Sequence, residues 1–353
     1  MKSLPLFPAS IVGSIPRPLV VRELIEKAEW DAADTFTMDA AIRFVVAMQE
    51  RAGLDVVNDG EWRRRSYIGV IAELAHGFTL EINPADGRPW TVVTDKLTPK
   101  PAGFIAAEAA FVKKVATVAT KITLPAPALL GERLWDAKRS KKAYPNRDDF
   151  VRACVAPLRA EIALLQDMGV EIVQIDDPHL CLFVDPDVRR KYDNPDRAAD
   201  FAVEMINETV RGFDGIKFAV HLCRRAGARV RGEKHHAGTY GPILEQLNRL
   251  KVQHLTMEFT AAGADDLESL GRLREDFELG LGVVDVTPGA PEAALLIAAR
   301  VERALSRIDK ARITLNPDCG FAPGSAAKVD IDEVYLKLKA EAEAARMLRA
   351  KYA

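Results

Sequence analysis

The run Ile216–Leu222 (IKFAVHL) is short and apolar over most of its length. At its end stand two side chains with reactive chemistry, His221 within the run and Cys223 directly after it. A short apolar run of this kind is typical of a strand buried in a parallel sheet. Seven further runs have the same character: Ser10–Gly13, Leu54–Asn58, Lys121–Leu124, Val170–Ile175, Val252–Phe259, Leu279–Val286 and Ala311–Leu315. The sequence therefore predicts eight buried parallel strands.

Segments with helical periodicity lie between these runs. They are Asp149–Met168, Arg197–Phe213, Gly241–Leu250, Asp266–Leu273, Pro291–Ile308 and Asp330–Tyr352. Strands that alternate with helices predict an α/β fold, and a count of eight predicts a (β/α)8 TIM barrel, with a doubly wound open sheet as the alternative. We expect residues 1–353 to form one domain.

Residues 62–120 separate the second and third predicted strands and are too many for one helix. They contain the turn Gly87-Arg88-Pro89 and a stretch rich in Thr and Val (TVVTDKL). We expect an insertion within the barrel here, a β-hairpin plus a helix, of the kind that forms a lid or a substrate wall.

Composition narrows the class of protein. The 49 basic and 51 acidic residues give a formal net charge of −2, which argues against nucleic-acid binding through charge. We find no signal peptide and no run of the roughly 18 apolar residues that cross a bilayer, so we expect a cytoplasmic protein without a membrane partner. Four cysteines are too few for a disulfide scaffold in a chain of 353 residues.

A set of metal ligands follows the predicted strands. His221 and Cys223 stand two residues apart, so their side chains face the same side of a strand. Glu258 ends the next predicted strand and Cys319 follows the last one, and in a barrel all these strand ends open onto one face. Each residue alone would more often be structural, but two thiolates, an imidazole and a carboxylate together suit zinc.

The charge of such a centre indicates its chemistry. Two thiolates, one carboxylate and Zn²⁺ sum to −1, which makes a poor activator of water. A substrate thiol could replace the carboxylate and lose its proton, because a thiol bound to zinc is deprotonated at neutral pH. The sequence therefore predicts transfer of an alkyl group to a zinc-bound thiolate.

Polar residues also follow the earlier strands. Ser14 follows the first strand, Glu61 the second and Asp176 the fourth. The two carboxylates could hold a substrate ammonium group, and the serine hydroxyl with nearby backbone N–H groups could hold a carboxylate. This set suits an amino acid that carries a thiol, although such residues also commonly cap the helices that follow strands.

Six motifs together resemble the catalytic barrel of the cobalamin-independent methionine synthase family over essentially the whole chain. They are Val12–Pro18 (VGSIPRP), Asp59–Glu61 (DGE), Gln174–Pro178 (QIDDP), His221–Cys223 (HLC), Met257-Glu258 and Asn316–Phe321 (NPDCGF). The resemblance implies zinc bound by His221, Cys223, Glu258 and Cys319, and homocysteine bound by Ser14, Glu61 and Asp176. It implies a homocysteine S-methyltransferase of the short methionine synthase type.

The sequence departs from the long methionine synthases at residues that would act on the methyl donor. Leu182 stands where they carry an active-site glutamate, and Thr287 where they carry a catalytic histidine. Trp135 loosely matches their folate-stacking tryptophan, and their additional N-terminal barrel is not part of this sequence. A methyl-cobalamin protein or a small methylated compound is therefore the donor most compatible with the sequence.

Two alternatives remain open. Similar short proteins are epoxyalkane:coenzyme M transferases, which would use Arg17, Arg224 and other arginines near the strand ends for a sulfonate. A metal-free barrel like uroporphyrinogen decarboxylase is the other. We also consider His179 a candidate proton carrier, and expect Cys154 and Cys181 to be buried thiols. Lys234, His235 and His236 could belong to a substrate lid.

Overall fold

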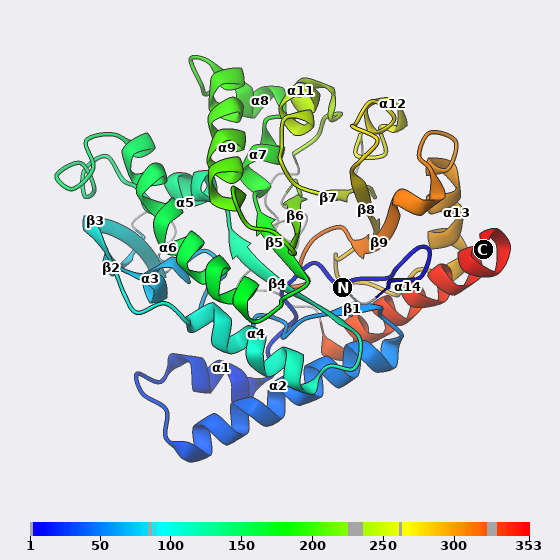
Figure 1. The fold of residues 1–353 in the computed structure, drawn as a ribbon, viewed down its shortest axis with the longest axis horizontal. Coiled ribbons are helices and arrows are strands. Elements are labelled where there is room, and N and C mark those ends of the chain that lie inside the picture. The colour runs from blue at the N-terminus through cyan, green and yellow to red at the C-terminus, as the bar shows by residue number, and fades with distance from the viewer. Residues whose placement is uncertain (1–2, 84–86, 88, 225–235, 261–262, 323–329) are drawn as a thin grey trace.

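The computed structural model describes residues 3–83, 87, 89–224, 236–260, 263–322 and 330–353. Its centre is a curled sheet of seven parallel strands, which follow one another in chain order (Figure 1). The strands are β1 (Val56–Val57), β4 (Ala119–Pro125), β5 (Ile172–Asp176), β6 (Lys217–Leu222), β7 (His254–Glu258), β8 (Glu278–Val284) and β9 (Ile313–Pro317). Because this order never reverses, the sheet lacks the switch point that a doubly wound sheet requires.

The first predicted strand lies between the two edges of this sheet. Ala9 bridges Leu315 of β9, and Ser10 bridges Val56 of β1, both in parallel orientation. The backbone N–H of Ser10 donates to the carbonyl of Leu315 at 3.0 Å, and the N–H of Val56 donates to the carbonyl of Ala9 at 3.2 Å. The result is an α/β fold whose curled seven-stranded sheet is consistent with a TIM-like barrel.

Helices cover the outside of the sheet (Figure 1). Going round it, α2 contacts α4, α4 contacts α6, α6 contacts α9, and α14 contacts both α13 and α2. The bounds of these helices are α2 (Ala32–Ala52), α4 (Phe104–Val115), α6 (Arg147–Asp167), α9 (Pro195–Val210), α13 (Ala294–Ala304) and α14 (Ile331–Tyr352). Shorter helices are α1 (Leu19–Glu26), α3 (Ile71–Leu74), α5 (Pro127–Leu134), α7 (Pro178–Leu182), α8 (Pro186–Arg189), η1 (Gly241–Ile243), α11 (Leu244–Asn248), α12 (Leu267–Leu270) and η2 (Lys310–Arg312).

The segment 62–120 contains the antiparallel hairpin β2 (Ala75–Ile82) and β3 (Pro89–Pro99), followed by α4. A hairpin and a helix are the elements that its sequence indicates. That the segment is an insertion in an otherwise plain barrel stays a prediction.

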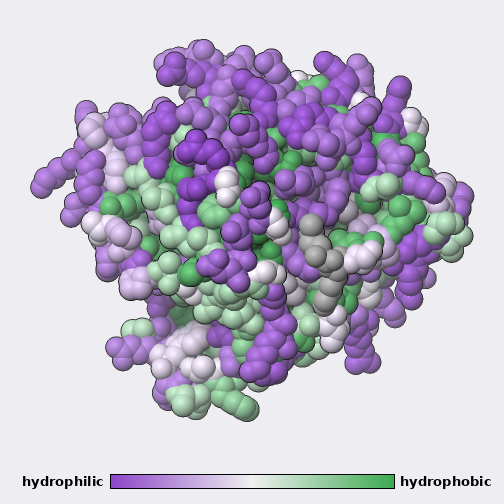
Figure 2. All heavy atoms as spheres, viewed as in Figure 1, coloured by the Kyte–Doolittle hydropathy of each residue, from purple (hydrophilic) through white to green (hydrophobic). Residues whose placement is uncertain are grey.

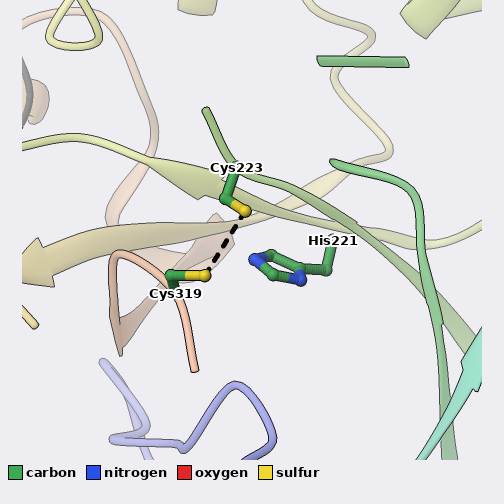
Figure 3. Close-up of side chains that lie close together, drawn as sticks. All are labelled: His221, Cys223 and Cys319. Atoms are coloured by element: carbon green, nitrogen blue, oxygen red, sulfur yellow. Dashed lines mark hydrogen bonds between the residues drawn. The ribbon is translucent and has the colours of Figure 1, made fainter. Parts of the chain in front are cut away.

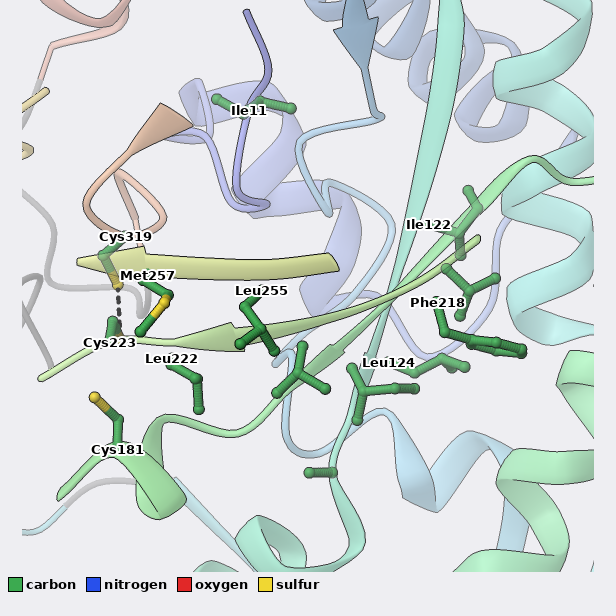
Figure 4. Close-up of a cluster of buried hydrophobic side chains, with 14 of the residues drawn as sticks. Ile11, Ile122, Leu124, Cys181, Phe218, Leu222, Cys223, Leu255, Met257 and Cys319 are labelled. Atoms are coloured by element: carbon green, nitrogen blue, oxygen red, sulfur yellow. Dashed lines mark hydrogen bonds between the residues drawn. The ribbon is translucent and has the colours of Figure 1, made fainter. Parts of the chain in front are cut away.

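Apolar side chains from successive strands fill the space around the sheet (Figure 4). Leu124, Leu222 and Leu255 are fully buried. Leu222 ends β6 and Cys223 follows it directly; Cys223 points toward Cys319 while Leu222 points the other way, as alternation along an extended chain requires. The face shown in Figure 2 is mostly hydrophilic, with apolar side chains scattered between. Among the described residues, no helix is long and apolar enough to span a membrane.

The bridge at Leu315 gives a test of the sheet closure. Leu315 is fully buried, whereas Leu295 on α13 is 65% exposed. Leu315→Ala should lower the free energy of unfolding by about 2–5 kcal/mol, because it leaves a cavity in the core. Leu295→Ala should change it by less than about 0.5 kcal/mol. The midpoints of urea unfolding measure both, and equal midpoints would contradict the placement of Leu315.

Candidate active site

A cavity of about 190 Å³ lies at the carboxyl ends of the strands. Seven of the residues that the sequence singles out line it: Ser14, Glu61, Asp176, His179, His221, Cys223 and Cys319. The remaining lining residues are Val12, Gly13, Ser66, Tyr67, Ile68, Leu129, Arg133, Pro178, Leu182 and Gly320. In a barrel of parallel strands this end is where substrates bind, so the cavity is the candidate active site.

His221, Cys223 and Cys319 converge within this cavity. One ligand atom from each lies within 4.8 Å of the others, and the two sulfurs are 3.4 Å apart. Figure 3 shows the imidazole beside the pair of sulfurs. The hydrogen bond to Cys319 and burial raise the pKa of the Cys223 thiol well above its ordinary value. Two thiolates in this place therefore require a cation.

The imidazole of His221 is oriented for a metal. Its Nδ1 lies 3.0 Å from Oδ1 of Asp176, and a carboxylate only accepts, so Nδ1 carries the proton. The Nε2 atom is buried, and the imidazole interacts with the side chain of Cys319. A histidine held by a carboxylate at one nitrogen, with the other directed at thiols, is a common arrangement at zinc sites. The three residues therefore fit a divalent metal.

Glu258, the fourth predicted ligand, lies beside this cluster but is not one of its members. Its side chain is fully buried, and Oε2 accepts the backbone N–H of Arg224 at 2.6 Å. Its charge also raises the pKa of the Cys223 thiol, although the hydrogen bond to Cys319 and burial raise that pKa more. The structure thus brings together three of the four predicted ligands.

The predicted substrate residues line the same cavity as the metal cluster. Glu61 is buried in the left-handed conformation, with a φ of 61°, and its Oε1 accepts the hydroxyl of Thr123 at 2.8 Å. A Cβ atom at Gly13 would come within 2.9 Å of this oxygen, so the glycine is required for the close approach. Strained backbone of this kind is concentrated at functional sites.

A buried ion pair supports the part of the cavity wall that contains Glu61. Arg64 donates through Nη2 and Nε to Oε2 of Glu108 on α4, at 2.7 and 2.9 Å. Its Nη1 donates to the hydroxyl of Thr123 at 3.0 Å, which links the pair to Glu61. Burial raises the pKa of Glu108 to about 7, although Arg64 opposes this shift. The segment 62–120 therefore positions Glu61 through both Arg64 and Glu108.

Three predicted binding residues do not line the cavity. Arg17 donates to the backbone carbonyls of Glu61 and Arg64, at 2.8 and 2.7 Å. Arg224 is buried, with its guanidinium over the ring of Tyr240. Trp135 donates to the carbonyl of Tyr144 at 3.1 Å. The other arginines after Cys223, together with Lys234 and His235, lie outside the described residues.

The structure also places the residues at which the sequence departs from the long methionine synthases, and the histidines outside the metal cluster. Leu182 lines the cavity, whereas Thr287 does not. His179 lines the cavity, and its Nε2 lies 2.9 Å from the hydroxyl of Tyr192. His236 lies 2.9 Å from Asp185, away from the metal ligands. Cys154 and Cys181 are buried free thiols, as expected.

The sequence did not point to Ser66, Tyr67, Ile68, Leu129 or Arg133 as cavity residues. The first three begin the segment 62–120, for which we predicted only a lid or wall. Leu129 and Arg133 lie on α5, a helix that we did not predict. The proline at the start of α5, Pro127, is a helix-start signal that could have revealed it.

The fold and the cavity define a barrel-like α/β enzyme with a thiol-rich candidate metal centre. The family model "Cobalamin-independent synthase, Catalytic domain" matches residues 7–347. Methionine synthases from Saccharolobus islandicus (strain Y.N.15.51) and Saccharolobus solfataricus are each 30% identical to this chain, with 91% of the chain and 90% of the relative covered.

Two solved structures have the same fold. A B12-independent methionine synthase from Shewanella sp. W3-18-1 superposes with a TM-score of 0.79 at 21% identity, covering 98% of this chain and 99% of the other. A putative vitamin-B12 independent methionine synthase from Listeria monocytogenes superposes with a TM-score of 0.72 at 22% identity, with the same coverage of both chains. At these identities the structures establish the fold alone. By the family model and the curated relatives, the chain belongs to the cobalamin-independent methionine synthase family, a family of methyltransferases.

Metal analysis tests the candidate centre. Protein purified without chelators should carry about one equivalent of zinc, because the three clustered residues fit a single ion. Cys223→Ala should lower the content to less than about a tenth of an equivalent. Cys154→Ala removes a buried thiol on α6 and should leave the content unchanged. A wild-type protein with less than about a tenth of an equivalent would contradict the assignment.

Proposed function

We propose that the protein is a zinc-dependent homocysteine S-methyltransferase of the short methionine synthase type, which acts in methionine biosynthesis. The observation that carries this proposal is the convergence of His221, Cys223 and Cys319 on one cavity with Ser14, Glu61 and Asp176. The names of the curated relatives and their nearly equal length support it. The buried free cysteines support a reducing, cytoplasmic location.

His221, Cys223 and Cys319 would hold the zinc, with Glu258 as the fourth ligand before substrate arrives. Bound there, zinc would supply a Lewis acid that keeps the sulfur of a substrate thiol in its thiolate form. The carboxylate of Asp176 binds Nδ1 of His221, so that Nε2 is directed away from the carboxylate. The imidazole ring therefore need not reorient when a metal binds. We also propose that the fold is a strict eight-unit barrel, with the segment at Ala9 and Ser10 as its first strand.

The amino-acid part of homocysteine would lie against Glu61, Asp176 and Ser14. Both hydrogen bonds of Asp176, from Gln174 and with His221, use Oδ1, so Oδ2 can accept from the substrate ammonium. Burial raises the pKa of Glu61, while Arg64 opposes the shift. An ammonium group would favour the carboxylate form further, so the site is suited to a cationic amine.

The methyl donor is proposed to be a methyl-cobalamin protein or a small methylated compound rather than a methyl-folate. Trp135 does not line the cavity, and Leu182 presents an apolar side chain to it. The coenzyme M alternative was assigned Arg17 and Arg224 for its sulfonate, and both of these arginines are engaged elsewhere. Membership of the family argues against a metal-free decarboxylase.

Ligand protection tests the choice of thiol. Homocysteine should raise the midpoint of thermal unfolding of the zinc-loaded protein, because binding stabilises the folded state. Glu61→Gln should weaken homocysteine binding by about tenfold or more, through loss of a charge-assisted hydrogen bond. Glu23→Gln, at an exposed position on α1, is the matched control. Protection by coenzyme M but not by homocysteine would reject the proposal in favour of the epoxide reaction.

A further inference from the structure

The cavity has two chemically different halves. The inner half contains the metal cluster with Ser14, Glu61 and Asp176, and these residues offer carboxylate, thiol, imidazole and hydroxyl groups. The outer half is formed by the segment 66–68, by α5 and by α7. It combines four apolar residues, Ile68, Leu129, Pro178 and Leu182, with four polar ones, Ser66, Tyr67, Arg133 and His179. Since the inner half already accounts for the thiol substrate, the outer half is the place for the alkyl donor.

Arg133 is the only arginine or lysine among the described residues that line this cavity. In the described part of the chain its guanidinium has no hydrogen-bond or ion-pair partner. Three other arginines, by contrast, have partners: Arg17 with backbone carbonyls, Arg64 with Glu108, and Arg147 with Glu132. Arg133 is exposed, and a guanidinium that lines a cavity beside apolar side chains is suited to a carboxylate, a sulfonate or a phosphate.

Tyr67 offers a second donor beside Arg133. Burial raises the pKa of its hydroxyl, the charge of Arg133 lowers it, and the groups of Cys223, Cys319 and Asp176 raise it further. The hydroxyl therefore stays protonated and is subject to both Arg133 and the metal cluster. Within the described residues it has no hydrogen-bond partner, so it is available to a ligand that extends from the thiol to the mouth.

We propose that Arg133 and Tyr67 form a subsite for the leaving group of an alkyl donor that departs as an oxyanion. This inference rests on the proposed function, and of its two donors it selects the small compound, with the alkyl group carried on oxygen. The thiolate sulfur forms a bond to the donor carbon as the carbon–oxygen bond breaks, and the electron pair of that bond stays on the oxygen. Arg133 and the Tyr67 hydroxyl then donate hydrogen bonds to the resulting anion, so no further reactant is needed.

Anion binding to the zinc-loaded protein tests the subsite. The probe is methanesulfonate, titrated by calorimetry against an equal ionic strength of sodium chloride, with homocysteine present. Wild-type protein should bind it, and Arg133→Gln should weaken binding by about tenfold or more through loss of a charged donor. Tyr67→Phe, which removes one hydroxyl, should weaken it by about threefold to tenfold. Arg22→Gln, at an exposed position on α1, should have no effect.

The outcomes separate this inference from the proposed function. If wild type does not bind methanesulfonate, or if Arg133→Gln binds it as tightly as wild type does, the subsite is wrong. Homocysteine binding by Arg133→Gln should equal that of wild type, since the arginine lies outside the inner half. Failure of the wild-type protein to bind homocysteine would instead reject the proposed function.

Discussion

The hydrogen bond between Nδ1 of His221 and Oδ1 of Asp176 is the contact on which the site depends. The two residues are register partners at the ends of β5 and β6, so the parallel pairing of the strands places their side chains next to each other. The bond fixes the tautomer and turns Nε2 toward the sulfurs of Cys223 and Cys319. The curl of the sheet then brings the end of β9, and with it Cys319, to the same cavity.

Buried polar groups behind the site keep this contact in place. Gln174 donates to the same oxygen of Asp176 at 2.7 Å, and Lys121 donates to Gln174 at 2.9 Å inside the barrel. Burial lowers the pKa of Lys121 to about 8, although Asp176 and Glu341 oppose the shift. A buried network is stable only when its members are satisfied together, so substitutions at Gln174 should act on the metal site through Asp176.

Much of this arrangement follows from strand patterns in the sequence. Parallel strands end on one face, so His221, Cys223, Cys319 and Asp176 could be placed together before their contacts were known. Alternation along a strand also predicts that Arg224 points away from Cys223, a consequence that our binding assignment for Arg224 overlooked. Helix α2 was not predicted from the sequence, because Phe36 and Phe44 are exposed on it and obscure the apolar face, although the capping box at Asp31 marks its start. The direction of a long side chain such as Arg133 depends on tertiary packing and has no local signal.

The most direct test of the account is the X-ray absorption spectrum of the zinc-loaded protein before and after addition of homocysteine. With Cys223 and Cys319 as ligands, the account predicts two sulfur atoms at about 2.3 Å from the metal before homocysteine and three afterwards. An unchanged sulfur count, in protein shown to be saturated with homocysteine, would contradict thiol activation at this centre.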